Sequence, residues 1–168
     1  MQHTPEELAL LKAAVLADPV AAQHRLDGSV KYLTDWLNAP SAVLAWKPLV
    51  AYQDMVENLN YATFDSVTAG KRDAFKIMLD AAKSGQLDGA TTAKPRKGIA
   101  DIFAVVGGYT DSAQAPGMLN GAFVEFATNA QAAIGYAQQP AAVAGVTAQK
   151  RKFTGQCAED TANWLINN

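Results

Sequence analysis

The side chains best suited to nucleophilic or metal chemistry are few in this sequence: two histidines and one cysteine. His3 and His24 both precede residue 25, and neither belongs to a metal-ligand spacing such as HExxH. Cys157 has no histidine near it in the sequence and falls on the inward phase of a predicted helix, which favours a buried structural thiol. We therefore predict exposed or cap-proximal histidines, no metal site and no cofactor.

Carboxylates are the other candidates for catalysis. Asp54 and Glu57 are spaced to share one helix face, and Asp101 would need a more distant partner. An acid–base pair requires environments that drive the two pKa values apart, and nothing in the sequence around these residues suggests that. The motifs GxGxxG, GxxxxGK[ST] and GxSxG are absent. We expect solvated carboxylates, no catalytic residues and a protein that is not an enzyme.

Two basic clusters lie close to predicted helix starts, where the helix dipole makes cations mildly unfavourable. The basic clusters have two alternative explanations: they keep the surface soluble, or they contact an acidic partner or nucleic-acid phosphate. Nothing in the sequence indicates nucleic acid specifically. The residues of this hypothetical partner interface are Lys94, Arg96, Lys97, Lys150, Arg151 and Lys152.

The composition describes a globular chain of about one domain. Of its 168 residues 49% are apolar and 18% charged, and the net charge of −2 excludes a generally basic nucleic-acid coat. A single cysteine excludes an internal disulfide framework. The N-terminus is acidic where a signal peptide is basic, and apolar runs are shorter than the ~20 residues of a membrane span. The sequence predicts synthesis in the cytoplasm and no membrane contact.

Capping signals and apolar spacing predict a helical chain. Thr4-Pro5-Glu6-Glu7 is a capping box with proline at the first helical position, and Gly85 stands where a helix-ending glycine belongs. Residues 41–61 are ambiguous: we expect a helical turn through Trp46 and a helix over 48–59, with a strand over 43–46 as the alternative. The other predicted helices cover residues 5–17, 30–38, 69–84, 95–106, 117–137 and a final segment from about 147.

These elements predict an all-α fold, a compact bundle of six or seven helices in a single domain over 1–168. A subdomain break is expected, if anywhere, near 85–94 or 107–115. Trp36, Trp46 and Phe75 lie on the inward phase of their segments and are the predicted core aromatics.

Several segments, in order, resemble a known family. They are TPEELALLKAAVLADPVAA at 4–22, SAVLAWK at 41–47, FDSVTAGKRDAFKIMLD at 64–80 and RKGIADIF at 96–103. Together they are similar to a family of small structural or assembly proteins encoded among the head and tail genes of tailed bacteriophages. The resemblance covers roughly residues 4–105. The last third departs from that family's pattern, in which a basic helix precedes a Thr/Gly-rich tail.

The resemblance implies a non-enzymatic role in the virion, and it attaches no catalytic residue to any position. The preferred assignment is a head–tail connector (adaptor, or neck) subunit that assembles as a ring on the portal. Its partners would then be further copies of itself and portal or tail proteins, and its location the virion. The alternatives are a tail or capsid-associated accessory protein, a monomeric helical binding module, and a small virion-associated cell-wall hydrolase using acidic residues such as Glu125.

Overall fold

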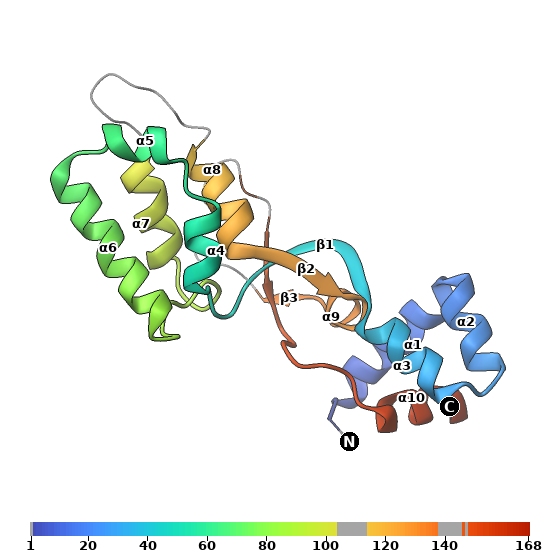
Figure 1. The fold of residues 1–168 in the computed structure, drawn as a ribbon. Helices are drawn as coiled ribbons and strands as arrows, with labels where there is room; N and C mark the ends of the chain where they lie inside the picture. Colours follow the sequence, from blue (N-terminus) through green and yellow to red (C-terminus); the bar gives the residue numbers. More distant parts are fainter. Residues whose placement is uncertain (1, 104–113, 138–145, 147) are drawn as a thin grey trace. The chain divides into compact units, whose positions relative to one another are not determined.

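The computed structural model describes residues 2–103, 114–137, 146 and 148–168. The chain divides into two compact units, each built from segments far apart in the sequence (Figure 1). Unit 1 comprises residues 1–43, 126–137 and 151–168, and unit 2 comprises residues 44–125 and 138–150. The sequence predicted one domain with a break near 85–94 or 107–115, whereas both of those segments fall inside the long stretch of unit 2.

Unit 1 is a helical cluster that brings the two ends of the chain together. Asp18 separates its first two helices, because its carboxylate accepts hydrogen bonds from the backbone of Val20 and Ala21 and so starts a new helix. Its core is formed by apolar residues that include Leu11, Leu33 and Leu165. The helices are α1 (Pro5–Ala17), α2 (Pro19–Leu26), α3 (Val30–Asn38), α9 (Asn129–Ile134) and α10 (Glu159–Asn167).

Side chains fasten the C-terminal segment to the N-terminal helices in this unit. The side-chain amide of Asn38 makes two hydrogen bonds to the main chain of Cys157: its Nδ2 donates to the carbonyl at 2.9 Å, and its Oδ1 accepts from the N–H at 2.8 Å. Arg25 donates to the carbonyl of Leu165 at 2.7 Å. Residues more than a hundred positions apart thus hold one another in place.

Unit 2 carries the largest buried aromatic side chains. Phe75, Phe103 and Phe123 are fully buried in one cluster that also includes Trp46. The helices are α4 (Tyr52–Glu57), α5 (Tyr61–Ser66), α6 (Ala69–Lys83), α7 (Lys94–Phe103) and α8 (Gln114–Met118), followed by one π-helical turn, η1 (Leu119–Phe123).

Short strands accompany these helices, so the predicted all-α bundle of six or seven helices is wrong in detail. Strand β1 (Pro40–Trp46) pairs with β2 (Val124–Thr128), and β3 (Tyr136–Ala137) pairs with β4 (Lys150–Arg151). Over the described residues the structure has ten α-helices and is predominantly helical, as the capping and spacing predicted. The bundle prediction failed because it took every apolar run as a helix face.

The segment around Trp46 forms the strand that was the alternative prediction. The N–H groups of Trp46 and Lys47 donate to the carbonyls of Gln149 and Phe123, at 2.9 and 2.8 Å. Extended backbone is stable here because distant parts of the chain satisfy its polar groups. The helix predicted over 48–59 is shorter than expected and runs only over α4.

The long helix predicted over 117–137 is broken in the middle. The chain is extended in β2, and Thr128 then starts α9 with a capping box to Gln131. Phe126, on the predicted inner face, is 60% exposed for this reason. The final helix begins at Glu159 rather than near 147, because Lys150 and Arg151 are in β4.

Several local predictions are confirmed. α1 lies where its capping box placed it, and α3 and α6 lie where their apolar spacing placed them, although the predicted cap Thr68 makes no capping hydrogen bond to α6. Gly85 has a φ of +68° just after α6. The predicted helix 95–106 corresponds to α7, and its last three residues lie outside the described part. Of the three predicted core aromatics, Phe75 and Trp46 are buried, whereas Trp36 is only half-buried against the unit 1 core.

Candidate functional site

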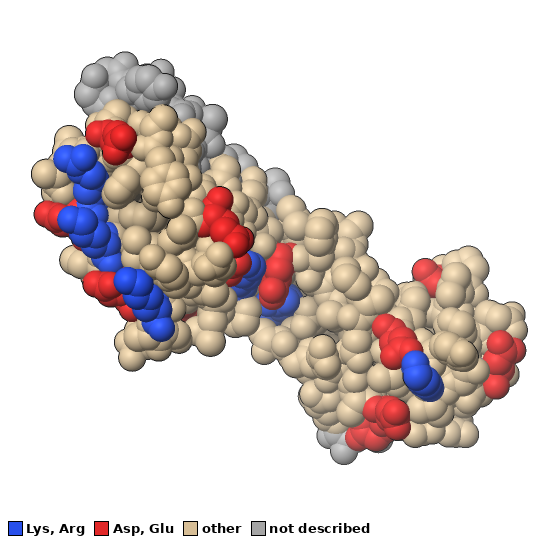
Figure 2. Space-filling view, in the orientation of Figure 1, with Lys and Arg blue, Asp and Glu red and all other residues tan. Residues whose placement is uncertain are grey.

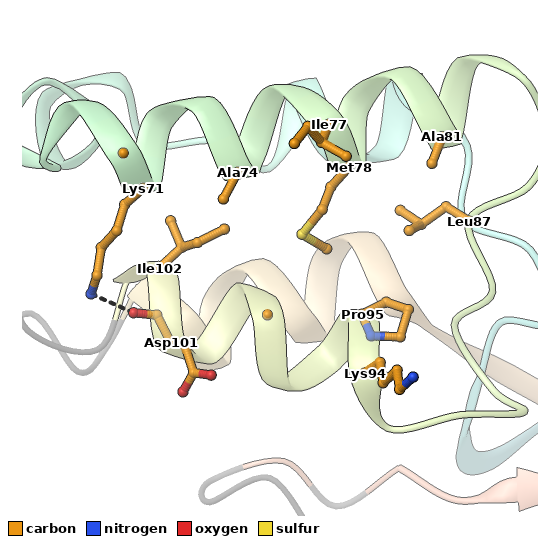
Figure 3. A pocket seen from close by; sticks show the side chains of 12 residues that line it. Lys71, Ala74, Ile77, Met78, Ala81, Leu87, Lys94, Pro95, Asp101 and Ile102 are labelled. Atoms are coloured by element: carbon orange, nitrogen blue, oxygen red, sulfur yellow. Dashed lines mark hydrogen bonds between the residues drawn. The ribbon is translucent and has the colours of Figure 1, made fainter.

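Helices α6 and α7 of unit 2 leave an apolar groove between them (Figure 3). Its volume is about 520 Å³, and most of its lining consists of small or aliphatic side chains. Ile77 is 71% exposed, which is unusual for an isoleucine in the middle of a 15-residue helix. The lining residues are Gly70, Lys71, Ala74, Ile77, Met78, Ala81, Leu87, Lys94, Pro95, Gly98, Asp101 and Ile102.

A lysine stands at each end of this groove. At one end the Lys71 ammonium on α6 donates to the main-chain carbonyl of Asp101 on α7, and at the other end lies Lys94 beside Pro95 (Figure 3). Basic side chains also form a row over α6, interspersed with acidic ones (Figure 2). The groove is therefore an apolar surface with cationic ends, which suits a partner that is apolar along its middle and acidic at one end.

The first basic cluster, at the start of α7, does not act as one patch. Lys94 and Lys97 are exposed, but Arg96 is only 1% exposed. Its guanidinium lies 4.5 Å from the centre of the Trp46 ring and donates to the carbonyl of Gly89 at 2.7 Å. Burial lowers the pKa of Arg96, and the negative charge of Asp88 opposes that change. The hypothesis that Arg96 contacts a partner is wrong, because its side chain is buried and its Nη1 atom donates inside unit 2.

The loop that receives Arg96 requires glycine at one position. A Cβ added to Gly89 would lie 2.5 Å from the carbonyl oxygen of Lys47 and 2.8 Å from Val50 Cγ2. Only the absence of a side chain lets the backbone come this close. Gly89 thus places its carbonyl where Arg96 can donate to it.

The second basic cluster is divided in the same way. Arg151, in β4, is buried and donates to the Gln131 side chain at 3.1 Å, whereas Lys152 is exposed and Lys150 half-buried. Reversing the charge of Arg151 would therefore disturb unit 1 itself. Of the six predicted interface residues, the four lysines remain available to a partner and the two arginines do not.

His3 and Cys157 meet in unit 1, although 154 residues separate them. The Nε2 atom of His3 is 3.4 Å from the Cys157 Sγ, and its Nδ1 is 3.5 Å from the Glu7 carboxylate. The Phe153 ring packs edge-on to the imidazole, with 4.7 Å between ring centroids. Of the predicted alternatives, exposed or cap-proximal, His3 is the second: it is buried beside Thr4, the N-cap of α1. Sequence spacing held no signal for this contact, because the packing of the two chain ends creates it.

The surroundings of Cys157 favour a buried structural thiol over a nucleophile. Burial, with a smaller contribution from the charge of Asp160, raises the pKa of the Cys157 thiol from 9.0 to about 11. A nucleophilic cysteine has a lowered pKa instead, since the thiolate is the reactive species. The buried thiol predicted from the sequence is confirmed.

We expect the native protein at pH 8 to react with iodoacetamide at least about a hundredfold more slowly than the protein unfolded in urea. Because folding raises the thiol pKa, the stability contributed by the neutral Cys157 is complete below pH 9.0 and is lost as the pH rises toward 11. Mass spectrometry of the alkylated chain over time measures the rates. Equal rates in native and unfolded protein would contradict the burial of Cys157.

Comparison of the chain with protein-family models, with curated proteins and with solved structures found no match.

The candidate carboxylates take part in local structure. Asp54 forms an ion pair with Lys47 at 2.8 Å and accepts from the Ala51 N–H, and Glu57 accepts from the Gln53 amide. Over the described residues no three His, Cys, Asp or Glu side chains are grouped as metal ligands would be. In the same part of the chain no helix is both long and apolar enough to cross a bilayer. The α6–α7 groove with its lysines remains the best candidate site.

Proposed function

We propose that this protein is a non-enzymatic structural protein of a tailed-bacteriophage virion, a head–tail connector subunit that acts by ring assembly on the portal. The proposal combines the resemblance over residues 4–105 with the surface of unit 2. The single structural observation that carries it is the open apolar groove between α6 and α7 with Lys71 and Lys94 at its ends. A surface of this kind is typical of a protein that binds another protein.

The titratable side chains support a binding role over a hydrolytic one. Asp54 is paired with Lys47, and Cys157 is held protonated by burial. A hydrolase that uses acidic residues needs two carboxylates in contrasting environments to act as acid and base. The exposed lysines instead offer charges that would guide the encounter with an acidic neighbour and set its register.

The test is the composition of purified particles from the phage that encodes the chain. We expect the protein in virions at a fixed number of copies per particle, located at the neck in a particle reconstruction. Its absence from purified particles would contradict the virion assignment. A position in the tail or on the capsid would replace the connector by an accessory protein.

Charge reversal tests the exposed lysines. The double variant Lys94→Glu/Lys97→Glu should fold normally and enter particles at about a tenth of the wild-type level or less, because like charges at an interface repel. Lys31→Glu is the matched control, since Lys31 is an exposed lysine on α3 of unit 1, far from both basic clusters in the sequence. Normal incorporation of the double variant would remove these lysines from the interface.

A further inference from the structure

Helix α1 has two apolar faces, and unit 1 buries only one of them. Leu8, Leu11 and Val15 lie in the core of unit 1. On the opposite side Leu10 is 46% exposed and Leu16 is 54% exposed. Ala9, Ala13 and Ala17 are also exposed and fall on the same side at helical spacing. A helix that is apolar all round is normally covered on every side.

The exposed face of α1 is almost free of charge. Glu6, at the start of the helix, is its one exposed charged residue, since Glu7 bonds to Thr4 and Lys12 donates to the carbonyl of Asn168. This face is an apolar ridge of small and medium side chains with one acidic end.

The α6–α7 groove matches the α1 ridge in length, in its apolar middle and in the charge at one end. Its lining on α6 runs from Gly70 to Ala81, and the α1 stripe runs from Glu6 to Ala17, so each extends about 16 Å along its helix. The groove is apolar in the middle, where the stripe has Leu10, Ala13 and Leu16. Lys94 is at one end, and the Lys71 ammonium, which donates to the main-chain carbonyl of Asp101, is at the other (Figure 3). Glu6 would be attracted to a lysine at either end, and the negative charge of the nearby Asp101 side chain makes the Lys71 end the less favourable of the two.

We infer that α1 of one copy of this protein docks in the α6–α7 groove of a second copy, with Glu6 at the Lys94 end. The two surfaces differ, so the contact is heterologous: each copy presents one ridge and one groove. Such head-to-tail contacts form closed rings when the rotation between neighbours closes, and open filaments otherwise. The inference rests on the proposed ring assembly and names the surfaces that would build it. One helix in one groove is a small interface, so the affinity of a single contact is modest.

Two single substitutions each remove one of these surfaces. Ile77→Glu places a carboxylate in the groove, and Leu16→Glu places one on the ridge. Both side chains are largely exposed, so the fold should survive each change. Tyr61→Glu on α5 is the matched control, because Tyr61 is 60% exposed and lies outside the groove lining.

Sedimentation velocity at about 10 to 200 µM, a range suited to a small interface, measures self-association. We expect oligomers for the wild type and for Tyr61→Glu. Ile77→Glu and Leu16→Glu should each be monomeric, with apparent dissociation constants at least about tenfold higher, because a charge would have to be buried. Mixed in equal amounts, the two variants should form a dimer and nothing larger, since only one intact ridge and one intact groove then meet.

The outcomes are distinct. A monomeric wild type, oligomers of either variant alone, or an equimolar mixture that stays monomeric would overturn the α1–groove contact. The amount of protein in purified particles separates this contact from the proposed function. If the Ile77→Glu variant enters virions as efficiently as the wild type, the protein is a virion protein but does not use the α1–groove contact. If the protein self-associates through α1 but is absent from virions, the α1–groove contact is supported and the virion role is contradicted.

Discussion

Replacing Phe75 by alanine should lower the free energy of unfolding of unit 2 by about 3–5 kcal/mol, the usual cost of deleting a buried aromatic side chain. Phe75 has no exposed surface, and its ring centroid is 5.3 Å from that of Phe64 and 5.8 Å from that of Phe103. The substitution removes these ring contacts and leaves a cavity between α6 and α7 that the surrounding helices fill only in part.

Urea denaturation measures this change, with a probe confined to unit 2. The chain has three tryptophans, of which Trp46 lies in the unit 2 core while Trp36 and Trp164 pack against the unit 1 core. A background with Trp36→Phe and Trp164→Phe leaves Trp46 fluorescence as the reporter. Ile77→Ala on the same helix is the control and should change the midpoint little, because Ile77 is exposed. Equal midpoints for Phe75→Ala and Ile77→Ala would show that the assigned core face of α6 is wrong.

Replacing Arg96 by alanine should also cost about 3–5 kcal/mol of unit 2 stability, although the residue is charged and stands in a basic sequence cluster. Hydrogen bonds from charged donors contribute about 1.5–3 kcal/mol, and a desolvated cation–π contact about 2 kcal/mol. Arg96 makes both, to the carbonyl of Gly89 and to the Trp46 ring. Removing it leaves a buried carbonyl without its donor and takes the cation away from the face of the Trp46 ring.

Two further variants separate these contributions. Arg96→Met keeps most of the volume against Trp46 but donates no hydrogen bond, so it should recover only the packing part of the loss. Arg96→Lys keeps the charge but not the planar group that stacks on the ring, and should be intermediate. Lys97→Ala, one residue along on the exposed face of α7, is the control. A stability of Arg96→Ala within about 0.5 kcal/mol of the control would contradict the buried position of the guanidinium.

Local signals in the sequence were sufficient for part of the fold. Thr4, Pro5 and Glu7 form the capping box that starts α1, and Gly85 ends α6 with a left-handed backbone. These features depend on residues within one or two helical turns of each other, so a sequence pattern contains them completely. The inward position of Phe75 was predicted for the same reason, since helical spacing assigns it to the apolar face of α6.

The strands were not predictable in this way. β1 and β2 contain apolar residues whose spacing is compatible with a helix, and their extended form depends on partners such as Phe123 and Gln149. Pairing between distant segments leaves no local mark except a weak preference for β-branched and aromatic residues. The helix predicted over 117–137 was wrong because propensity in an alanine-rich segment was outweighed by these tertiary hydrogen bonds.

The same distinction between local sequence signals and tertiary structure applies to the candidate site. The sequence by itself determined that this is a mainly helical chain with little net charge, one buried thiol, and basic residues at the start of α7. Only the tertiary structure decided that Arg96 lies under Trp46 while Lys94 stands at the end of a groove, and that His3 meets Cys157. The physical reason is that helical periodicity separates an inner from an outer face but does not identify which distant segment covers the inner one. Whether a charged side chain such as Arg96 is buried, and whether Leu16 and Ile77 stay exposed, depends on which distant segment packs against their helices.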